Sequence, residues 1–339
     1  MDVLESVFAR AEGSGIRVCF PEATEEKILL ASREVTDKHY AVVSLAGDPA
    51  AIKAAAAQYN VDLTGIDIID TTDEEALEKA AELYAGTTTT MLSKKAVLRR
   101  AKADPMYAGL MYQAIGDVDV CFAGLTHTTG EVILGGQMVI GLADGVSVVS
   151  SVGIFNIPGY EGSEGQLLAF GDSAVNTNPS DEDLASIAIS CCDTIRALLG
   201  WEPRCAMLSF STDGSMEHSM VDKVRSATKI ANELRPDLLI DGEFQFDSAV
   251  SPRVAAKKVR HDSKVAGRAN IVIWPDLNAG NIGVKLVQYL ARADAYGPML
   301  QGFRKIVCDC SRGAPVSELV GNVAMSVVRA KELKTLKEE

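Results

Sequence analysis

Short apolar runs alternate with stretches of helical periodicity along almost the whole chain. The first runs are IRVCF (16–20), AVVSLAG (41–47) and IDIID (66–70), and a helical pattern follows each of them. Near-continuous apolar strands of this kind are typical of parallel sheets that helices cover on both faces. The pattern therefore predicts repeated β-α units in a mostly parallel α/β fold.

The alternation continues to the C-terminus. Further strands are predicted at VDVCFAG (118–124), VSVVSSVGIFNI (146–157), QLLAFGD (166–172), CAMLSFST (205–212), DLLIDGEF (237–244), NIVIWPD (270–276) and KIVCDC (305–310). Helices are predicted at 25–37, 49–58, 74–84, 93–115, 181–199, 218–234, 280–292 and beyond Pro315 to about 334, with a short helix after 244. Ligands of such sheets bind beyond the carboxyl ends of the strands, so the polar residues there are the candidates for function.

The last of these strand exits, CSRGAPVSE (310–318), has the features of an anion site. Pro315 suits the first turn of a helix, whose N-terminus presents unpaired N–H groups. Ser311 adds a hydroxyl, and Arg312 adds a planar set of donors that matches phosphate. The plain alternative is a serine cap beside a solvated arginine.

Three other segments carry candidate ligand contacts. In PDLNAGNIG (275–283), amides, a carboxylate and glycines suit either a ligand or a tight structural turn. The hydroxyls of SFSTDGS (209–215) could line a cleft or cap the following helix. ADAYGPMLQG (293–302) is interpreted as a turn whose aromatic side chain stacks on a ring or packs internally. The residues singled out are Asp276, Asn278, Gly280, Asn281, Gly283, Ser209, Ser211, Thr212, Gly214, Tyr296, Gly297 and Pro298.

His127 and the acidic runs give weaker evidence of function than these segments. His127 lies in THTTGE without a nucleophile elbow or a cysteine-histidine signature, which favours a structural or substrate-positioning role over a catalytic triad. The acidic runs EATEE (22–26) and PSDEDL (179–184) are interpreted as solvated helix starts whose carboxylates offset the helix dipole.

Composition narrows the class of protein. The 339 residues, 47% hydrophobic and 23% charged, predict a soluble globular protein of about two domains. A net charge of −13 without a basic stripe argues against a nucleic-acid partner. The acid-bearing N-terminus and the absence of a long apolar run predict a cytoplasmic protein with no membrane partner. The seven cysteines lack zinc-ligand spacing, so reduced, mostly buried thiols and no metal are expected.

Taken together, the segments that follow the strands show that the sequence resembles the phosphate acetyltransferase (phosphotransacetylase) group of the phosphate acetyl/butyryltransferase family. The blocks that carry the resemblance are AMLSFSTDGSMEHSMVDKVRSATKIA, PDLLIDGEFQFDSAVSP, VAGRANIVIWPDLNAGNIGVKLVQYLARADAYGPMLQGF and DCSRGAPVSELV. They lie in the second half of the chain, in family order and spacing, and the resemblance extends over essentially the whole length.

The resemblance implies two doubly wound α/β domains, isocitrate/isopropylmalate dehydrogenase-like, with the active site in an interdomain cleft. Residues 1–145 and 303–339 would form the first domain, and 146–302 the second, which would supply the probable dimer interface. The implied protein is a homodimer that reversibly transfers an acetyl group between coenzyme A and phosphate. Coenzyme A is then a substrate, and no tightly bound cofactor is implied.

The chemistry expected is direct displacement: a carboxylate takes the proton of the coenzyme A thiol, and the thiolate attacks the acyl phosphate. By resemblance, Ser311 and Arg312 would hold the phosphate and carbonyl oxygens, and Glu318 would be the base where relatives usually have aspartate. The substrate-binding residues implied are Ser209, Thr212, Gly214, Asn278, Asn281, Gly283, Tyr296, Gly297, Gln301, Gly302 and His127.

Two departures from the family pattern concern cleft cations. Tyr84 and Leu134 occupy positions where many relatives have arginine. Lys94, Lys95, Arg99 and Arg100 could compensate, although their spacing also suits an exposed helix face. Three alternatives therefore stay open: a propionyl- or butyryl-specific enzyme, a non-catalytic acyl-CoA-binding member, and a hydride-transferring enzyme, the last without a dinucleotide fingerprint to support it.

Overall fold

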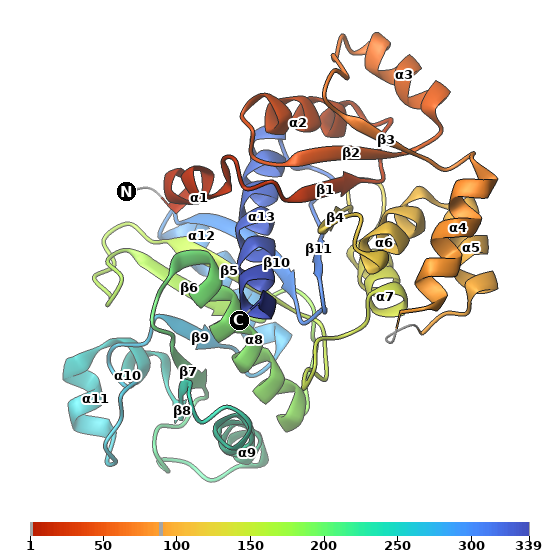
Figure 1. Ribbon diagram of the computed structural model, residues 1–339. Helices are drawn as coiled ribbons and strands as arrows, with labels where there is room; N and C mark the ends of the chain where they lie inside the picture. Colours follow the sequence, from red (N-terminus) through yellow and green to blue (C-terminus); the bar gives the residue numbers. More distant parts are fainter. Residues whose placement is uncertain (1–2, 88–90, 339) are drawn as a thin grey trace. The chain divides into compact units, whose positions relative to one another are not determined.

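The computed structural model describes residues 3–87 and 91–338, and the chain divides into two compact units. Unit 1 consists of Met1–Ala143 and Phe303–Glu339, and unit 2 of Asp144–Gly302. Both ends of the chain, red and blue in Figure 1, thus belong to unit 1. The interdomain cleft implied by the family resemblance stays a prediction.

Unit 1 is built on a parallel sheet. Its strands follow the order β11 (Ile306–Cys308), β4 (Val120–Phe122), β1 (Arg17–Phe20), β2 (Val42–Gly47) and β3 (Asp67–Asp70). The register aligns β11 with β4 and β4 with β1 residue by residue. Because parallel strands end at one edge of a sheet, the segments after β1, β4 and β11 come together, and this edge carries the site described below.

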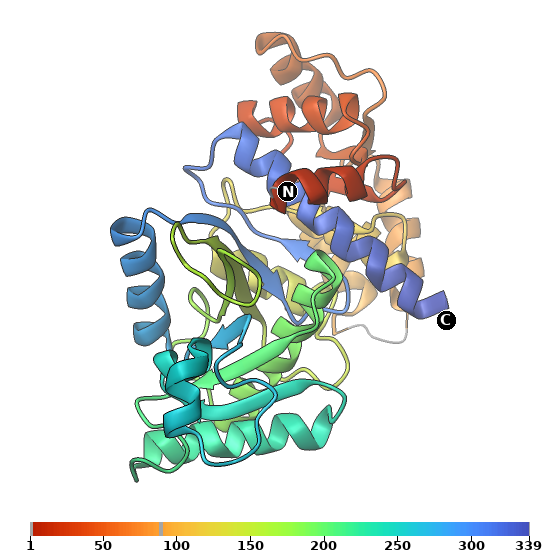
Figure 2. The same cartoon turned by 90° about the vertical axis from the view of Figure 1, so that its left-hand side faces the viewer.

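Helices cover both faces of this sheet. They are α1 (Val3–Ala11), α2 (Glu26–Asp37), α3 (Pro49–Gln58), α4 (Glu74–Ala85), α5 (Lys94–Ala103), α6 (Pro105–Ile115), α7 (Thr129–Val139) and α13 (Val316–Glu338). Helix α13 buries an apolar stripe that includes Leu319, Val323 and Val327 against the sheet, α1 and α2. Figure 2 shows α13 passing beside α1.

Unit 2 contains a mixed sheet. Its strands follow the order β10 (Asp294–Gln301), β5 (Ser150–Asn156), β6 (Leu167–Gly171), β9 (Ile271–Ile273), β7 (Arg204–Leu208) and β8 (Leu239–Phe244). Strand β5 is antiparallel to both neighbours, and the remaining pairs are parallel. The helices are α8 (Asp181–Leu199), α9 (Ser219–Leu234), α10 (Phe246–Val250), α11 (Pro252–Lys258) and α12 (Leu277–Leu290).

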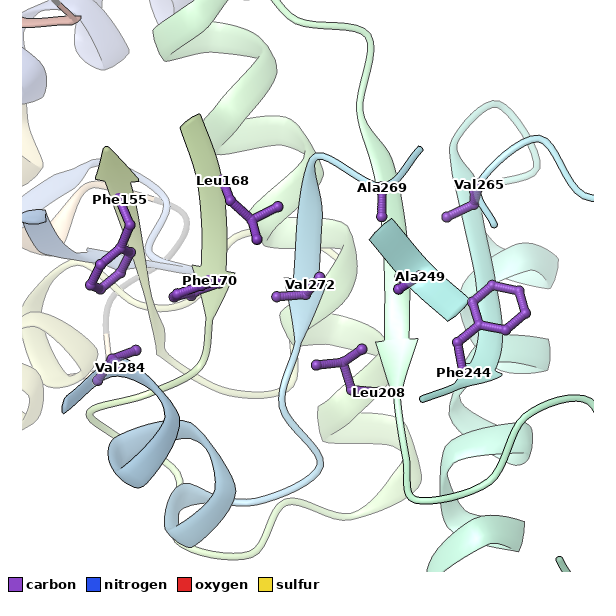
Figure 3. Close-up of a cluster of buried hydrophobic side chains, with 11 residues drawn as sticks. Phe155, Leu168, Phe170, Leu208, Phe244, Ala249, Val265, Ala269, Val272 and Val284 are labelled. Atoms are coloured by element: carbon purple, nitrogen blue, oxygen red, sulfur yellow. The ribbon is translucent and has the colours of Figure 1, made fainter. Parts of the chain in front are cut away.

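One apolar cluster of unit 2 packs on this sheet together with α12. Figure 3 shows Phe155, Phe170, Val272 and Leu208 on neighbouring strands, with Val284 reaching them from α12. The rings of Phe155 and Phe170 are 4.6 Å apart between centroids. Side chains of this size each gain about 1.5–3 kcal/mol on burial, so the layer accounts for much of the unit's stability.

The predicted mostly parallel α/β fold is confirmed, with corrections at particular elements. The segment with Tyr296, Gly297 and Pro298 is not a turn: it lies inside β10, which pairs with β5 through a shift in register between Tyr296 and Met299. The glycine-proline pair is the local signal of a turn, but at a sheet edge it accompanies an irregular strand instead. Helices α1 and α7 were not predicted, and α7 carries three glycines in TGEVILGGQMV.

The cysteines are free and buried, as the sequence predicted. Burial raises the pKa of the Cys19 thiol to about 12, which leaves it unreactive at neutral pH. Within residues 3–87 and 91–338, no helix is long and apolar enough to cross a membrane.

Helix α12 begins at Leu277, three residues before the predicted start, so Asn278, Gly280 and Gly283 are helical and do not form a turn. A Cβ on Gly280 would lie 2.7 Å from the Asp172 carbonyl, and one on Gly283 would lie 2.5 Å from the Trp274 ring. These glycines therefore let the helix approach its own sheet.

Gly283→Ala is expected to lower the free energy of unfolding by about 1–3 kcal/mol, because the rigid Trp274 ring must move. Gly130→Ala in α7 is the matched control, since its new Cβ would find its nearest neighbour at 4.0 Å. Urea unfolding of both variants measures the difference. Equal stability of the two would contradict the packing explanation.

Candidate active site

The Ser311-Arg312-Gly313 segment is an exposed turn between β11 and α13. The Ser311 carbonyl accepts a hydrogen bond from Ala314 N–H (3.0 Å), and Ser311 Oγ accepts one from Gly313 N–H (3.3 Å). Because α13 begins only at Val316, Ser311 is not its cap, whereas Arg312 is exposed, as the plain structural alternative also expects. Both side chains are accessible to a ligand, and Ser311 can still donate its hydroxyl proton.

Lys27 of α2 holds this turn from the side. Its Nζ donates hydrogen bonds to the carbonyl oxygens of Ala314 (2.9 Å) and Arg312 (3.5 Å). A second positive charge therefore lies next to the arginine. Lys27 follows the acidic run 22–26, which has the pattern of a solvated helix start, so the local sequence does not indicate this contact.

Glu318 is the third residue of α13 and is exposed. Its N–H donates to the Pro315 carbonyl (3.1 Å), which fixes it one turn beyond the serine and arginine. Its charge also reaches the buried Cys310 thiol, whose pKa is raised by burial first, then by Cys308, and last by nearby carboxylates that include Glu318. Glu318 thus lies on the same side of the sheet as the turn, and its role as the base stays a prediction.

Glu22 corrects the interpretation of EATEE as a solvated run. Its side chain is buried, and its carboxylate accepts hydrogen bonds from the backbone N–H groups of Gly124, Leu125, Thr126 and His127 at 2.7–3.2 Å. Burial opposes its ionisation, but the bonds from His127 and Thr126 outweigh burial and lower the pKa to about 2. Glu22 is the anion around which the loop after β4 folds.

His127 lies between two carboxylates. Its Nδ1 is 2.8 Å from Glu22 Oε1, and its Nε2 is 3.2 Å from Asp104 Oδ2. Asp104 and then Glu22 raise the pKa of His127 to about 10, so it carries a proton on both nitrogens at neutral pH. A histidine in this state cannot accept a proton, which supports the positioning role over a catalytic base.

The stability of unit 1 is expected to depend on His127 between pH 6.5 and about 10. The pKa in the folded state lies above the ordinary 6.5, so the stabilisation is complete below pH 6.5 and is lost as pH rises through about 10. His127→Gln should cost about 1–3 kcal/mol in urea unfolding at pH 6 and progressively less towards pH 10. His39→Asn, at an exposed histidine, is the control. A cost that does not change with pH would contradict this account.

A pocket of about 230 Å³ adjoins this cluster at the carboxyl ends of β1, β2 and β4. Its lining includes Glu22, Gly47, Asp48 and His127. His127 is thus the one sequence-predicted binding residue of unit 1, outside the turn, that the described structure places at a pocket. The acidic walls suit neutral or cationic groups better than phosphate.

Asp309 is a further group that the sequence did not indicate. It follows β11 directly, and its Oδ2 accepts a hydrogen bond from Thr129 Oγ1 (2.5 Å). Its Oδ1 is buried without a hydrogen-bond partner among the described residues. Burial raises the pKa of Asp309, and the bond from Thr129 only partly offsets it. This carboxyl group links the turn to the start of α7.

The two positions where the family resemblance implies arginines differ in structure. Tyr84 is fully buried in α4, whereas Leu134 is exposed on α7. Among the proposed compensating cations, Lys94 pairs with Glu82, and Arg100 donates to the Tyr107 hydroxyl (3.2 Å). Lys95 and Arg99 are exposed on α5, and compensation by these four residues stays a prediction.

In unit 2, the loop after β7 is organised by a buried carboxylate. Glu243 accepts hydrogen bonds from Ser211 Oγ (2.8 Å) and Gly214 N–H (3.0 Å) and pairs with Arg225 (2.9 Å). Thr212 is buried as well, and Ser209 is half-buried. The cap of α9 is His218, so the capping role suggested for these hydroxyl residues is wrong. Binding by Ser209, Thr212 and Gly214 stays a prediction.

The other predicted residues of unit 2 fall into two groups. Asn281, Tyr296 and Gly297 come together around a pocket of about 120 Å³ between α12 and β10. Gln301 is instead buried, and its Nε2 donates to Ser150 Oγ (3.0 Å). A Cβ on Gly302 would lie 2.9 Å from the Val148 carbonyl, so close packing by itself explains a glycine at this position. Asp276 caps α12, where its carboxylate accepts from Ala279 N–H (3.0 Å).

Comparisons with known proteins identify the family of the chain. The family model described as Phosphate acetyl/butaryl transferase matches residues 2–327. A phosphate acetyltransferase of Clostridium acetobutylicum is 40% identical over 334 residues, covering 97% of this chain and 99% of that protein. A phosphotransacetylase structure from Streptococcus pyogenes has a TM-score of 0.86 at 32% identity, covering 97% of this chain and 98% of that one.

A more distantly related class of proteins has a similar fold. A 4-hydroxythreonine-4-phosphate dehydrogenase from Klebsiella pneumoniae has a TM-score of 0.52 at 11% identity, over 94% of this chain and 99% of that one. This likeness concerns the fold alone and supports the dehydrogenase-like architecture. With a family model that matches nearly its whole length and a relative of 40% identity, the chain belongs to the phosphate acetyl/butaryl transferase family.

Proposed function

We propose that this protein catalyses the reversible transfer of an acetyl group between coenzyme A and phosphate. The observation that carries the proposal is the exposed Ser311-Arg312 turn, which Lys27 reinforces with a second positive charge. A guanidinium and an ammonium beside a hydroxyl donor suit a phosphate group in a protein of net charge −13. The names of its relatives agree with this reaction.

In the proposed mechanism, Arg312 and Ser311 bind acetyl phosphate through its phosphate and carbonyl oxygens. Glu318 removes the proton of the coenzyme A thiol, the thiolate sulfur bonds to the acetyl carbon, and phosphate leaves with the electrons of the C–O bond. Base assistance matters because a free thiol is mostly protonated near neutral pH. His127 keeps the loop after β4 in place and takes no proton.

Coenzyme A binding is proposed for residues of unit 2. Phe210, Met216 and Met220 are exposed in and after the loop that follows β7, beside the predicted Ser209 and Gly214. Apolar side chains beside backbone N–H groups suit the pantetheine arm and its amides. No group of three or more His, Cys, Asp or Glu in the described ranges is arranged to hold a metal ion.

The activity is tested by thioester absorbance with coenzyme A and a panel of acetyl, propionyl and butyryl phosphates. We expect turnover with acetyl phosphate, and the panel separates it from a propionyl- or butyryl-specific enzyme. Folded protein that binds acetyl-CoA saturably without turnover would favour the non-catalytic alternative. No turnover and no binding would overturn the proposal. A cytoplasmic location is part of the same proposal.

A homodimer is also proposed, with α12 at its interface. Ile282, Leu286, Tyr289 and Leu290 are each more than half exposed on this helix, opposite the face with Val284 that packs on the sheet. An apolar stripe of this size marks an interaction surface.

Leu286→Asp with Leu290→Asp is expected to convert the protein from a dimer to a monomer, because the carboxylates would be buried unpaired. Sedimentation velocity measures the change. Lys229→Asp with Glu233→Lys, at exposed positions of α9, is the control and should leave the mass unchanged. A wild-type monomer at micromolar concentration would contradict the prediction.

A further inference from the structure

His261 connects three segments of unit 2. It belongs to the segment that follows α11, its Nε2 lies 3.0 Å from Asp241 Oδ2, and its Nδ1 lies 3.3 Å from Asp213 Oδ1. Asp241 is part of the edge strand β8, and Asp213 lies in the loop after the neighbouring strand β7 (Figure 1). The ring is also stacked on Phe244, with 6.2 Å between centroids and 8° between planes. A single side chain therefore holds these segments together.

The two contacts of the ring require a protonated histidine. A neutral imidazole has one N–H, whereas the imidazolium has two and can donate to both carboxylates. Burial lowers the pKa of His261, but Asp241 and then Asp213 outweigh burial and raise it above the ordinary 6.5. The other carboxylate of β8, Glu243, pairs with Arg225 (2.9 Å). The remaining ionisable side chains of α11 and of the segment after it are exposed: Arg253, Lys257, Lys258, Arg260, Asp262, Lys264 and Arg268.

Loss of one proton breaks one of the two contacts. The remaining N–H is expected to stay with the shorter contact, to Asp241, whose Oδ2 also accepts from Ser263 Oγ (2.5 Å). The lone pair of Nδ1 then faces the Asp213 carboxylate, and two acceptors without a hydrogen between them repel each other. The loop after β7 keeps the hydrogen bond from Arg260 N–H to Asp213 Oδ2 (2.5 Å) but loses its ionic contact with the segment after α11.

Asp213 determines the course of the loop after β7. Its backbone has a φ of 47°, a left-handed conformation that few residues with a Cβ adopt without tertiary support. Its N–H donates to the Glu243 carbonyl (3.2 Å), and the N–H of the next residue, Gly214, donates to the Glu243 carboxylate (3.0 Å). Gly214 and Ser209 belong to the residues proposed to bind coenzyme A, so the protonation of His261 acts on that binding loop.

We propose that His261 is a positioning residue for coenzyme A: the protonated ring fixes the loop after β7 in its binding conformation, and the neutral ring releases it. The inference rests on the proposed function, since it requires that this loop contacts coenzyme A. Because the pKa in the folded state lies above 6.5, the loop is fully held below pH 6.5 and is released as pH rises beyond that value. The contribution of His261 to coenzyme A affinity should therefore be lost with rising pH.

Calorimetric titration of acetyl-CoA at pH 6 and pH 9 tests this inference, because acetyl-CoA has no free thiol and its phosphates titrate alike with every variant. Relative to His261→Gln, the wild-type protein should bind about five- to tenfold more tightly at pH 6 and about equally at pH 9. Asp213→Asn should bind more tightly than the wild-type protein at pH 9, because its amide can donate to the neutral ring. His39→Asn, at an exposed histidine of unit 1, is the control and should match the wild-type protein at both pH values.

Amide hydrogen exchange of residues 211–215 provides a readout that needs no ligand. Corrected for the pH dependence of the chemical exchange rate, their protection should fall between pH 6 and pH 9 in the wild-type protein and stay constant in His261→Gln. Equal protection of the two proteins at both pH values would overturn the inference, as would equal acetyl-CoA affinity at pH 6. Absence of acetyl-CoA binding together with the expected exchange result would count against the proposed function instead, so the two failures are distinguishable.

Discussion

Arg312→Gln is expected to lower kcat/KM for acetyl transfer by about 10²–10³-fold while the protein keeps its fold. The side chain is exposed, so its loss leaves no cavity. The expected loss comes from removing charge-assisted hydrogen bonds to the phosphate and the developing carbonyl charge. If Tyr84 and Leu134 stand where the family resemblance implies arginines, Arg312 would supply a larger share of the binding. Steady-state thioester assays measure the effect.

Arg312→Lys distinguishes charge from geometry. Lysine keeps the positive charge but loses the planar pair of donors, so an intermediate activity is expected. Arg253→Gln, at an exposed position of α11, is the matched control and should be neutral. An Arg312→Gln enzyme with wild-type kinetics would show that phosphate binds elsewhere and would remove the main support for the proposed site.

Glu318→Gln is expected to lower kcat at pH 7 by about 10²–10³-fold, as for other general bases. The defect should shrink as the pH approaches the pKa of the free thiol, since a growing fraction of coenzyme A is then already thiolate. Glu318→Asp should stay active, because it keeps a carboxylate one methylene shorter. The test is to measure kcat from pH 6.5 to 9 for the wild-type enzyme, Glu318→Gln and Glu318→Asp.

The pH dependence of the activity loss distinguishes Glu318→Gln from Arg312→Gln. The loss in Arg312→Gln should change little over the same pH range. Glu75→Gln, at an exposed glutamate of α4, controls for loss of one negative charge. A Glu318→Gln defect that is constant with pH would assign this residue to positioning and leave the base to be found elsewhere.

Some residues of the candidate site could not have been identified from local sequence. Glu22 has the same neighbours as a solvated helix start, and it becomes a buried anion only because four N–H groups from the loop after β4 converge on it. Lys27 reaches a turn nearly three hundred residues away in the chain. Asp309 differs from other polar residues that follow a strand only because it is buried.

The sequence by itself determined the α/β class and nearly all the strands, because buried parallel strands must be apolar along their length, and it predicted the Ser311-Arg312 segment as a candidate because polar groups are exposed where such strands end. Only the tertiary structure decided that Tyr296 lies in an edge strand, that the glycines of α12 face Trp274 and Asp172, and that His127 is clamped between two carboxylates. Those outcomes depend on which segments pack together, and a charge or a glycine has the same local pattern whether its partner is water, a ligand or a distant strand.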